Sequence, residues 1–320
     1  MRSKTIVRPP KLVPGSRIAL IAPAGPLLER DDLTRAQQLC RALGYEPLVG
    51  TNAHSRYGYL AGTDDQRSDD LNAALQSPSI DAVWCIRGGY GSIRLLERVD
   101  YDAIARRPKA LIGFSDITAL LNAVTRRSGV VTFHGPVARA AMPAFSREHF
   151  DRVLTSGETP GSLGRIPSSD DVLVPQDNRI VTLNGGTADG WLAGGNLTLL
   201  HCLIGTPYFP NLEGAVLFLE DVDEHLYRVD RMLAHLRIVG ALQQLAGVAV
   251  GRFTQLERAT RDGALGLDEV LATYFGPLGI PVAYGFPIGH IEAQWTLPLG
   301  VRARLNADAG ELELLEPAVV

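Results

Sequence analysis

The chain has few cysteines, little excess charge of either sign and no CxxC pair. Its three cysteines, Cys40, Cys85 and Cys202, are far apart in 320 residues. This excludes a disulfide scaffold and a cysteine-ligated zinc site, and it favours a reducing compartment. Lys and Arg total 31 against 35 Asp and Glu, a net charge of −4. The charge therefore indicates neither a nucleic-acid partner nor attachment to an anionic membrane.

Long apolar runs are also lacking. No segment approaches the ~20 apolar residues that a membrane-spanning helix requires. Basic residues near the start precede an apolar run at 18–22, but Pro23 ends it. A signal peptide needs roughly 7–15 apolar residues. We therefore expect a cytoplasmic protein without a cleaved leader, in which residues 18–22 form a buried strand.

The composition is that of a globular protein, with 46% hydrophobic and 21% charged residues. The length is typical of about two domains. Strand-like and helix-like segments alternate up to about residue 127, which predicts a parallel, doubly wound α/β sheet. The expected strands are 17–22, 45–49, 80–86 and 110–113, and the expected helices are 31–43, 64–76, 92–96 and 116–127.

Residues 156–185 lose this periodicity and are turn-rich, which predicts a linker. We therefore expect an α/β domain at 1–155 and a second, smaller mixed domain at 186–320. In the second domain the pattern predicts strands at 216–220 and 247–251, a helix at 226–239 and a terminal hairpin at 301–315. Ligands of parallel sheets bind beyond the carboxyl ends of the strands.

A serine follows the expected strand 110–113. Gly113 ends the strand, one residue intervenes, and Ser115 stands where a helix begins. This geometry exposes a hydroxyl beside helix N-terminal amides, as in a nucleophile elbow. Serine is equally a favoured helix cap, and Ile117 occupies the position of the second glycine of GxSxG. Taken alone, the pattern favours the cap.

A glycine-rich loop, Arg87-Gly88-Gly89-Tyr90-Gly91, follows the preceding strand. One of its backbone amides, with that of Asp116, could form an oxyanion hole for acyl transfer. The alternatives are a plain turn or a dinucleotide loop, although GxGxxG is absent.

A nucleophilic serine needs a base and an acid that orients the base. His290, in a Gly/Pro-rich loop, and His134 are the candidate bases, and Glu220, where an apolar strand ends, is the candidate acid. Asp221, Asp223 and Glu224 lie nearby, and such a cluster is usually a solvated loop. No close histidine pair or HExxH pattern supports a metal site.

Eight motifs together carry a resemblance that none carries alone. They are Ile21-Ala-Pro-Ala-Gly25, Tyr59-Leu-Ala-Gly62, Arg87-Gly-Gly-Tyr-Gly91, Gly113-Phe-Ser-Asp116, His134-Gly-Pro136, Gly194-Gly-Asn196, Leu219-Glu-Asp221 with Tyr227 and Asp230-Arg231, and Gly285-Phe-Pro-Ile-Gly-His290. In this order they resemble the LD-carboxypeptidase family of serine peptidases, which also contains the microcin C self-immunity hydrolases. The resemblance extends from about residue 16 to 315.

The resemblance implies a flavodoxin-like N-terminal domain, a smaller β-rich C-terminal domain and a homodimer without metal or cofactor. It implies a triad of Ser115 as nucleophile, His290 as base and Glu220 as acid, with Glu224 a weaker alternative acid. The amides of Gly89 and Asp116 match the oxyanion hole. One departure is His225 before Leu226 and Tyr227, where the family pattern has a proline before the tyrosine.

The implied activity is hydrolysis of the amide bond to the terminal D-alanine of muropeptide tetrapeptides, in cytoplasmic recycling of the cell wall. A first alternative is a hydrolase of peptidyl- or aminoacyl-nucleotide amides, as in microcin C immunity. A second is a non-catalytic two-domain protein that binds a small ligand, which predicts no contact between the serine and the histidine. Arg87 could bind a substrate carboxylate or simply form a salt bridge.

Overall fold

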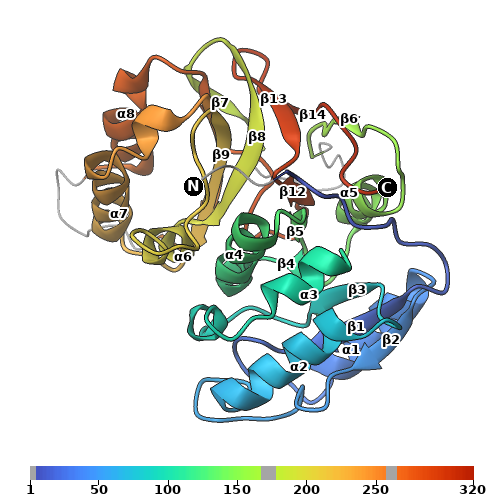
Figure 1. Cartoon of the computed structure of the whole chain (residues 1–320). Helices are drawn as coiled ribbons and strands as arrows, with labels where there is room; N and C mark the ends of the chain where they lie inside the picture. Colours follow the sequence, from blue (N-terminus) through green and yellow to red (C-terminus); the bar gives the residue numbers. More distant parts are fainter. Residues whose placement is uncertain (1–4, 167–177, 257–264) are drawn as a thin grey trace, which may run out of the picture.

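The computed structural model describes residues 5–166, 178–256 and 265–320, in which two β-sheets are packed with helices (Figure 1). Residues 167–177 of the predicted linker lie outside this described part. Helix α4 (Thr118–Ser128) contacts β4 and β5 of the first sheet and β8 of the second. The mixed α/β fold predicted from the sequence is confirmed.

The first sheet has the order β12-β5-β4-β3-β1-β2. Strands β1 to β5 are mutually parallel, and β12 adds an antiparallel edge. The order 2-1-3-4-5 is that of flavodoxin-like folds, so the flavodoxin-like expectation is confirmed. The strands are β1 (Arg17–Ile21), β2 (Glu46–Val49), β3 (Ala82–Cys85), β4 (Ala110–Gly113), β5 (Thr132–His134) and β12 (Leu297–Leu299).

The helices at 32–42, 64–76 and 118–128 lie close to where the alternating pattern predicts them. The predicted helix 92–96 is a 3₁₀ turn instead, and the helices at 101–106 and 144–154 were not predicted. Helix α2 has the predicted bounds because Thr63 and Gln66 form a capping box, in which each side chain accepts from the other residue's backbone N–H. The α-helices are α1 (Asp32–Ala42), α2 (Asp64–Gln76), α3 (Tyr101–Arg106), α4 and α5 (Ala144–Leu154), with 3₁₀ turns η1 (Ser92–Leu95) and η2 (Ser115–Ile117).

The second sheet has the order β6-β14-β13-β8-β9-β10-β11-β7, and its central strands β8 to β11 are parallel. The predicted hairpin is the antiparallel pair β13–β14. Helices α6, α7 and α8 lie together on one side of this sheet (Figure 1). The elements are β6 (Gly161–Ser162), β7 (Val181–Asn184), β8 (Thr187–Asn196), α6 (Leu197–Cys202), β9 (Ala215–Val222), α7 (Leu226–Ile238), η3 (Leu242–Gln244), β10 (Gly247–Thr254), α8 (Leu267–Phe275), η4 (Gly276–Leu278), β11 (Val282–Tyr284), β13 (Arg302–Asn306) and β14 (Glu311–Leu314).

Three strands lie in places that the predicted boundaries did not anticipate. Strands β6 and β7 fall within the predicted linker 156–185, yet both pair with strands of the second sheet. Strand β12 falls within the predicted domain 186–320, yet it pairs with β5 of the first sheet. The chain therefore crosses from the second sheet back to the first. The domain boundaries themselves stay a prediction.

One buried apolar cluster spans both halves, a second lies within the C-terminal half alone, and the two halves meet at the ends of their parallel strands. The apolar cluster around the first sheet includes Phe218 of β9 and Leu312 of β14. At the carboxyl end of β8, the backbone N–H of Asn196 donates to Thr118 Oγ1, the first residue of α4, at 3.0 Å. This contact places the ends of β8 and β9 beside the turn that follows β4.

Candidate active site

Ser115 lies in the turn between β4 and α4 with its backbone in the left-handed region. Its φ is 63°, whereas Phe114 before it is extended at −152°. Such a φ is strained for a residue with a side chain, and strain of this kind concentrates at functional sites. The N-cap positions of η2 and α4 are Phe114 and Ile117, and neither provides a side-chain cap. The interpretation of Ser115 as a helix cap is therefore wrong.

The Ser115 hydroxyl lies instead against His290, and His290 lies against Glu220. His290 Nε2 is 2.9 Å from Ser115 Oγ, and His290 Nδ1 is 2.8 Å from Glu220 Oε2. The Glu220 side chain is fully buried and that of His290 is 22% exposed. Because a carboxylate only accepts, Nδ1–H donates to Glu220, which leaves Nε2 of the neutral ring to accept from Ser115.

Three separate elements bring these side chains together. Ser115 follows β4, Glu220 is in β9 opposite Asn196 of β8, and His290 lies in the loop between β11 and β12. Gly289 makes the approach possible, because a Cβ there would lie 2.8 Å from both Cβ and Oε2 of Glu220. The three residues that the family resemblance selected are therefore joined in one line of hydrogen bonds.

The glycine-rich loop lies beside Ser115. A Cβ on Gly88 would be 2.9 Å from Ser115 Cβ and 3.4 Å from the backbone nitrogen of Asp116, so only glycine fits there. Gly89 follows with a φ of 113°. The loop is held from the other side, since the N–H of Gly25 donates to the carbonyl of Gly88 at 3.0 Å. The structure thus places the loop of Gly89 and the amide of Asp116 next to the serine.

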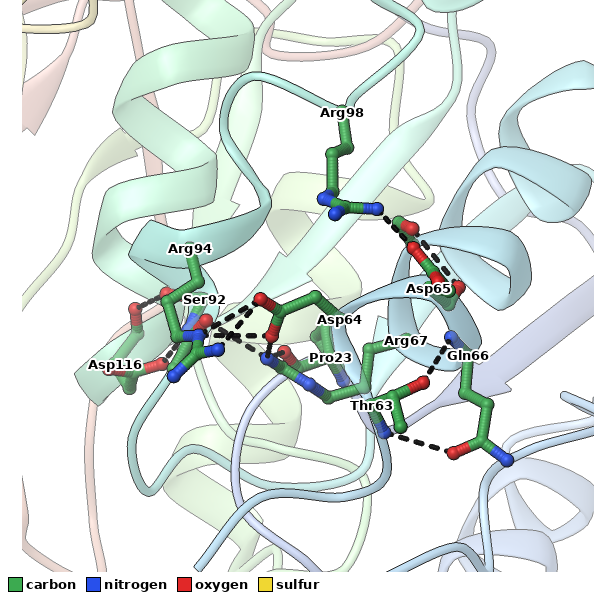
Figure 2. A network of polar contacts seen from close by, with 12 residues as sticks. Pro23, Thr63, Asp64, Asp65, Gln66, Arg67, Ser92, Arg94, Arg98 and Asp116 are labelled. Atoms are coloured by element: carbon green, nitrogen blue, oxygen red, sulfur yellow. Dashed lines mark hydrogen bonds and ion pairs between the residues drawn. The ribbon is translucent and has the colours of Figure 1, made fainter. Parts of the chain in front are cut away.

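A buried polar network supports this loop (Figure 2). The N–H of Ser92 donates to Asp116 Oδ2 at 2.8 Å, and Ser92 Oγ donates to the carbonyl of Asp116 at 2.5 Å. Burial raises the pKa of Asp116, and the hydrogen bonds from Ser92 oppose that rise. Asp116 is therefore held by both its side chain and its backbone.

Arg67 of α2 is the part of this network that the sequence reasoning missed. Its guanidinium, 1% exposed, donates to the carbonyls of Pro23 and Gly91 and pairs with Asp64 at 2.5 Å. Position 67 lies four residues before Leu71, on the face of α2 that turns inward. An arginine on the apolar face of a predicted helix is the signal that could have identified it.

A second buried acid stands next to Glu220. The Asp221 carboxylate accepts from Asn196 Nδ2 at 2.8 Å and from Thr198 N and Oγ1 at 2.9 and 2.8 Å. Burial and the neighbouring Glu220 raise the pKa of Asp221 to about 6. Asp221 therefore connects the end of β9 to the first turn of α6. Among the described residues, it forms no hydrogen bond with His290.

The other candidate residues do not join this line of hydrogen bonds. His134 is fully buried, and its ring nitrogens have no hydrogen-bond partner within the described residues. Glu224 accepts from Thr198 Oγ1 at 3.2 Å and pairs with Arg228 at 3.6 Å, away from His290. Arg87 Nη1 donates to the carbonyl of Pro26 at 2.5 Å. None of the three replaces a member of the hydrogen-bonded line.

Among residues 5–166, 178–256 and 265–320, no group of three or more His, Cys, Asp and Glu side chains gathers in a way that could hold a metal ion. Within the same ranges, no helix combines the length and the apolar character needed to cross a membrane.

Comparisons with known proteins identify the family to which both halves of the chain are similar. Residues 18–135 match the LD-carboxypeptidase N-terminal domain, and residues 189–305 match the LD-carboxypeptidase C-terminal domain. The murein tetrapeptide carboxypeptidase of Pseudomonas aeruginosa is 35% identical over 91% of this chain and 94% of its own length. Together these matches span both sheets.

Solved structures give the same relation. The crystal structure of muramoyltetrapeptide carboxypeptidase from Oxalobacter formigenes has 34% identity and a TM-score of 0.79, over 93% of this chain and 98% of that one. The structure of MccF, a microcin C7 self-immunity protein, in complex with glutamyl sulfamoyl guanosine has 25% identity and a TM-score of 0.86, over 98% and 99% of the two chains. With both domain models matched and relatives above a third identical along nearly its whole length, the chain belongs to the LD-carboxypeptidase family.

Proposed function

We propose that the protein is a serine carboxypeptidase that hydrolyses the amide bond to the terminal D-alanine of muropeptide tetrapeptides. The observation that carries this proposal is the line of hydrogen bonds from Ser115 Oγ through His290 to Glu220 Oε2. Residues 175 and 70 positions apart in sequence meet with donor and acceptor matched at each step. This is the arrangement of a serine nucleophile, a base and an orienting acid.

The first step follows from these contacts. His290 Nε2 takes the proton of Ser115 Oγ as the oxygen attacks the carbonyl carbon of the scissile amide. Glu220 holds the Nδ1–H tautomer and stabilises the imidazolium that forms. Because Glu220 is buried, its carboxylate is shielded from competing water.

The negative charge that develops on the carbonyl oxygen needs donors in place beforehand. The backbone amides of Gly89 and Asp116 are proposed as these donors, since both belong to segments held beside Ser115. Each such donor contributes about 3–4 kcal/mol to transition-state stabilisation in comparable hydrolases. His290 then protonates the leaving amine of D-alanine, and water hydrolyses the acyl-enzyme through the same base.

The test is release of D-alanine from a purified muramyl tetrapeptide by the wild-type protein and by Ser115→Ala. We expect release by the wild type and loss of release in the variant, with its circular dichroism spectrum unchanged. Release at the wild-type rate by the variant would exclude Ser115 as the nucleophile.

The second candidate keeps the chemistry and changes the substrate to an aminoacyl- or peptidyl-nucleotide amide. It is favoured by the similarity to MccF, whose structure contains glutamyl sulfamoyl guanosine. Incubation of the wild type and of Ser115→Ala with glutamyl sulfamoyl guanosine distinguishes the two candidate substrates. Release of glutamate without any release of D-alanine from the tetrapeptide would select the second substrate. The contact between Ser115 and His290 argues against the non-catalytic binding protein.

We also propose that the protein is a homodimer, as the resemblance implies, that it is cytoplasmic, and that its domains lie at 1–155 and 186–320, as the sequence pattern predicts. Light scattering after size exclusion measures the mass, and fractionation of cells measures the compartment. Limited proteolysis tests the boundaries, which predict first cleavage within 156–185.

A further inference from the structure

His134 stands between the strands that lead to the candidate active site. It ends β5, where it is paired with Gly113 of β4 on one side and Leu297 of β12 on the other. Strand β4 leads directly to Ser115, and β12 follows the loop that carries His290. The buried side chain of His134 therefore lies behind the site, on the strand between β4 and β12.

The ring of His134 packs against residues next to all three members of the candidate triad. It contacts Phe114, which precedes Ser115, with ring centroids 5.8 Å apart, and Phe218 at 5.2 Å. Phe114 in turn contacts His290 at 4.8 Å. Phe218 is two residues before Glu220 in β9, so the two side chains share a face of the strand. This places His134 on the Glu220 side of the site.

Several buried polar atoms in this region have no hydrogen-bond partner within the described residues. They include both ring nitrogens of His134, Oε1 of Glu220 and Oγ1 of Thr296. Thr296 lies close by, since a Cβ on Gly135 would be 2.9 Å from its Oγ1. Buried polar groups are nearly always satisfied by protein or by ordered water, and Glu220 uses its other oxygen for His290.

The chemistry of the two groups is complementary. Burial and, less strongly, the neighbouring His290 lower the pKa of His134 to about 4, against the opposing effect of Glu220. The ring is therefore neutral near pH 7 and has one N–H donor. Glu220 Oε1 can only accept. A donor and an acceptor thus lie in one apolar surrounding, where a hydrogen bond is stronger than in water.

We propose that His134 is a positioning residue, which donates a hydrogen bond through one buried water to Oε1 of Glu220. This bond fixes the plane of the carboxylate while Oε2 accepts from His290 Nδ1. The effect on catalysis rests on the proposed function, whereas the effect on the Glu220–His290 hydrogen bond does not.

Two variants distinguish a role of the His134 N–H donor from a role of the aromatic ring in packing. His134→Phe keeps an aromatic ring between Phe114 and Phe218 but cannot donate, and His134→Gln keeps an N–H donor. We expect His134→Phe to lower kcat for D-alanine release about 10- to 100-fold with KM unchanged, because a tilted carboxylate misorients His290. His134→Gln should keep most of the wild-type kcat.

A spectroscopic measurement needs no substrate. The proton between His290 Nδ1 and Glu220 gives a low-field proton resonance when this charge-assisted bond is short and ordered. We expect that resonance in the wild type and in His134→Gln, and its loss or displacement in His134→Phe. If the resonance changes only in His134→Phe while the wild type releases no D-alanine, the proposed function fails and the positioning role of His134 stands.

Two results would overturn the proposal. One is a His134→Phe variant with wild-type kcat and an unchanged resonance. The other is equal loss of kcat in both variants, in proportion to their loss of thermal stability, with the resonance unchanged. If His134→Phe does not fold, a high-resolution crystal structure of the wild type decides instead. A water within hydrogen-bond distance of both His134 and Glu220 Oε1 supports the role, and its absence there excludes it.

Discussion

Arg67 Nη1 donates a hydrogen bond of 2.9 Å to the carbonyl of Gly91, the residue that ends the glycine-rich loop. The same nitrogen donates to the carbonyl of Pro23, after β1, at 2.6 Å. One buried guanidinium therefore fixes two loops at the carboxyl edge of the first sheet. We therefore expect the position of the Gly89 amide, two residues earlier in the loop, to depend on Arg67 of helix α2.

Replacing Arg67 with lysine should destabilise the protein by about 3 kcal/mol and lower kcat, because an ammonium cannot replace the fixed fork of donors and two buried carbonyls lose partners. Urea denaturation and D-alanine release measure the two effects. Arg94→Lys is the matched control, since Arg94 pairs with the same Asp64 but its side chain is 43% exposed. That change should cost less than about 1 kcal/mol. Equal costs for the two variants would contradict a special role for Arg67.

Ser115→Gly and Ser115→Ala should both lose D-alanine release but differ in stability. The φ of 63° is unfavourable for alanine and favourable for glycine, so the glycine variant should be more stable than the alanine variant by about 1 kcal/mol. Thermal unfolding of the two inactive proteins measures the difference. An alanine variant as stable as the glycine variant would mean that the turn carries no strain.

Glu220→Gln should lower kcat by about 10³- to 10⁴-fold with little change in KM, because the amide can hold the wrong tautomer of His290. Glu224→Gln is the control, since Glu224 contacts Thr198 and Arg228 instead of His290. Steady-state kinetics on the tetrapeptide compare the two. Wild-type turnover in Glu220→Gln, or a large loss in Glu224→Gln, would reverse the assignment of the acid.

Stability should depend on pH through His134. Burial lowers the pKa of His134 from 6.5 to about 4. Between these values the unfolded chain binds a proton that the folded chain does not, so the stability is lost as pH falls through this window. The full effect is roughly 3 kcal/mol.

The measurement compares the wild type with His134→Phe by urea denaturation at pH 7 and pH 4.5. The wild type should lose about 2 kcal/mol more than the variant on acidification. Asp221, with its pKa raised to about 6 by burial and by Glu220, contributes with the opposite sign in this range. Because both proteins keep Asp221, its contribution cancels in the difference. Equal losses would mean that His134 is protonated in the folded state.

The alternating pattern predicted β1 to β4 and helices α1, α2 and α4 of the flavodoxin-like half from local signals, but it did not predict α3, β5 or α5. Helix α2 has a capping box at Thr63, and β3 and β4 are short apolar runs that end at glycine or polar loops. Strand β12 gave no such signal. It has three residues, Leu297 to Leu299, with a proline in the centre, and only its pairing with β5 makes it a strand.

Local sequence patterns and the family resemblance contributed differently to the prediction of the candidate site. Gly113 and Ser115 indicated a turn that bears a hydroxyl, but local preference favoured a helix cap, because serine is common at caps and backbone strain cannot be seen in a sequence. Glu220 was selected because it stands where an apolar strand ends, and the family resemblance pointed to the same residue, with Glu224 as the weaker alternative. The pairing of Glu220 with His290 depends on β9, β11 and β12 together, which no local pattern encodes.

The strand β12 has a consequence for the molecule as a whole. The loop that carries His290 begins at β11 of the second sheet and ends at β12 of the first sheet. The chain therefore connects the two sheets at the candidate active site. A fragment cut at the predicted boundary near residue 155 would leave β5 as a bare edge and His134 uncovered. Such edges invite pairing with other chains. We therefore expect the N-terminal half expressed alone to aggregate, because β12 comes from the C-terminal part of the chain and covers the edge at β5.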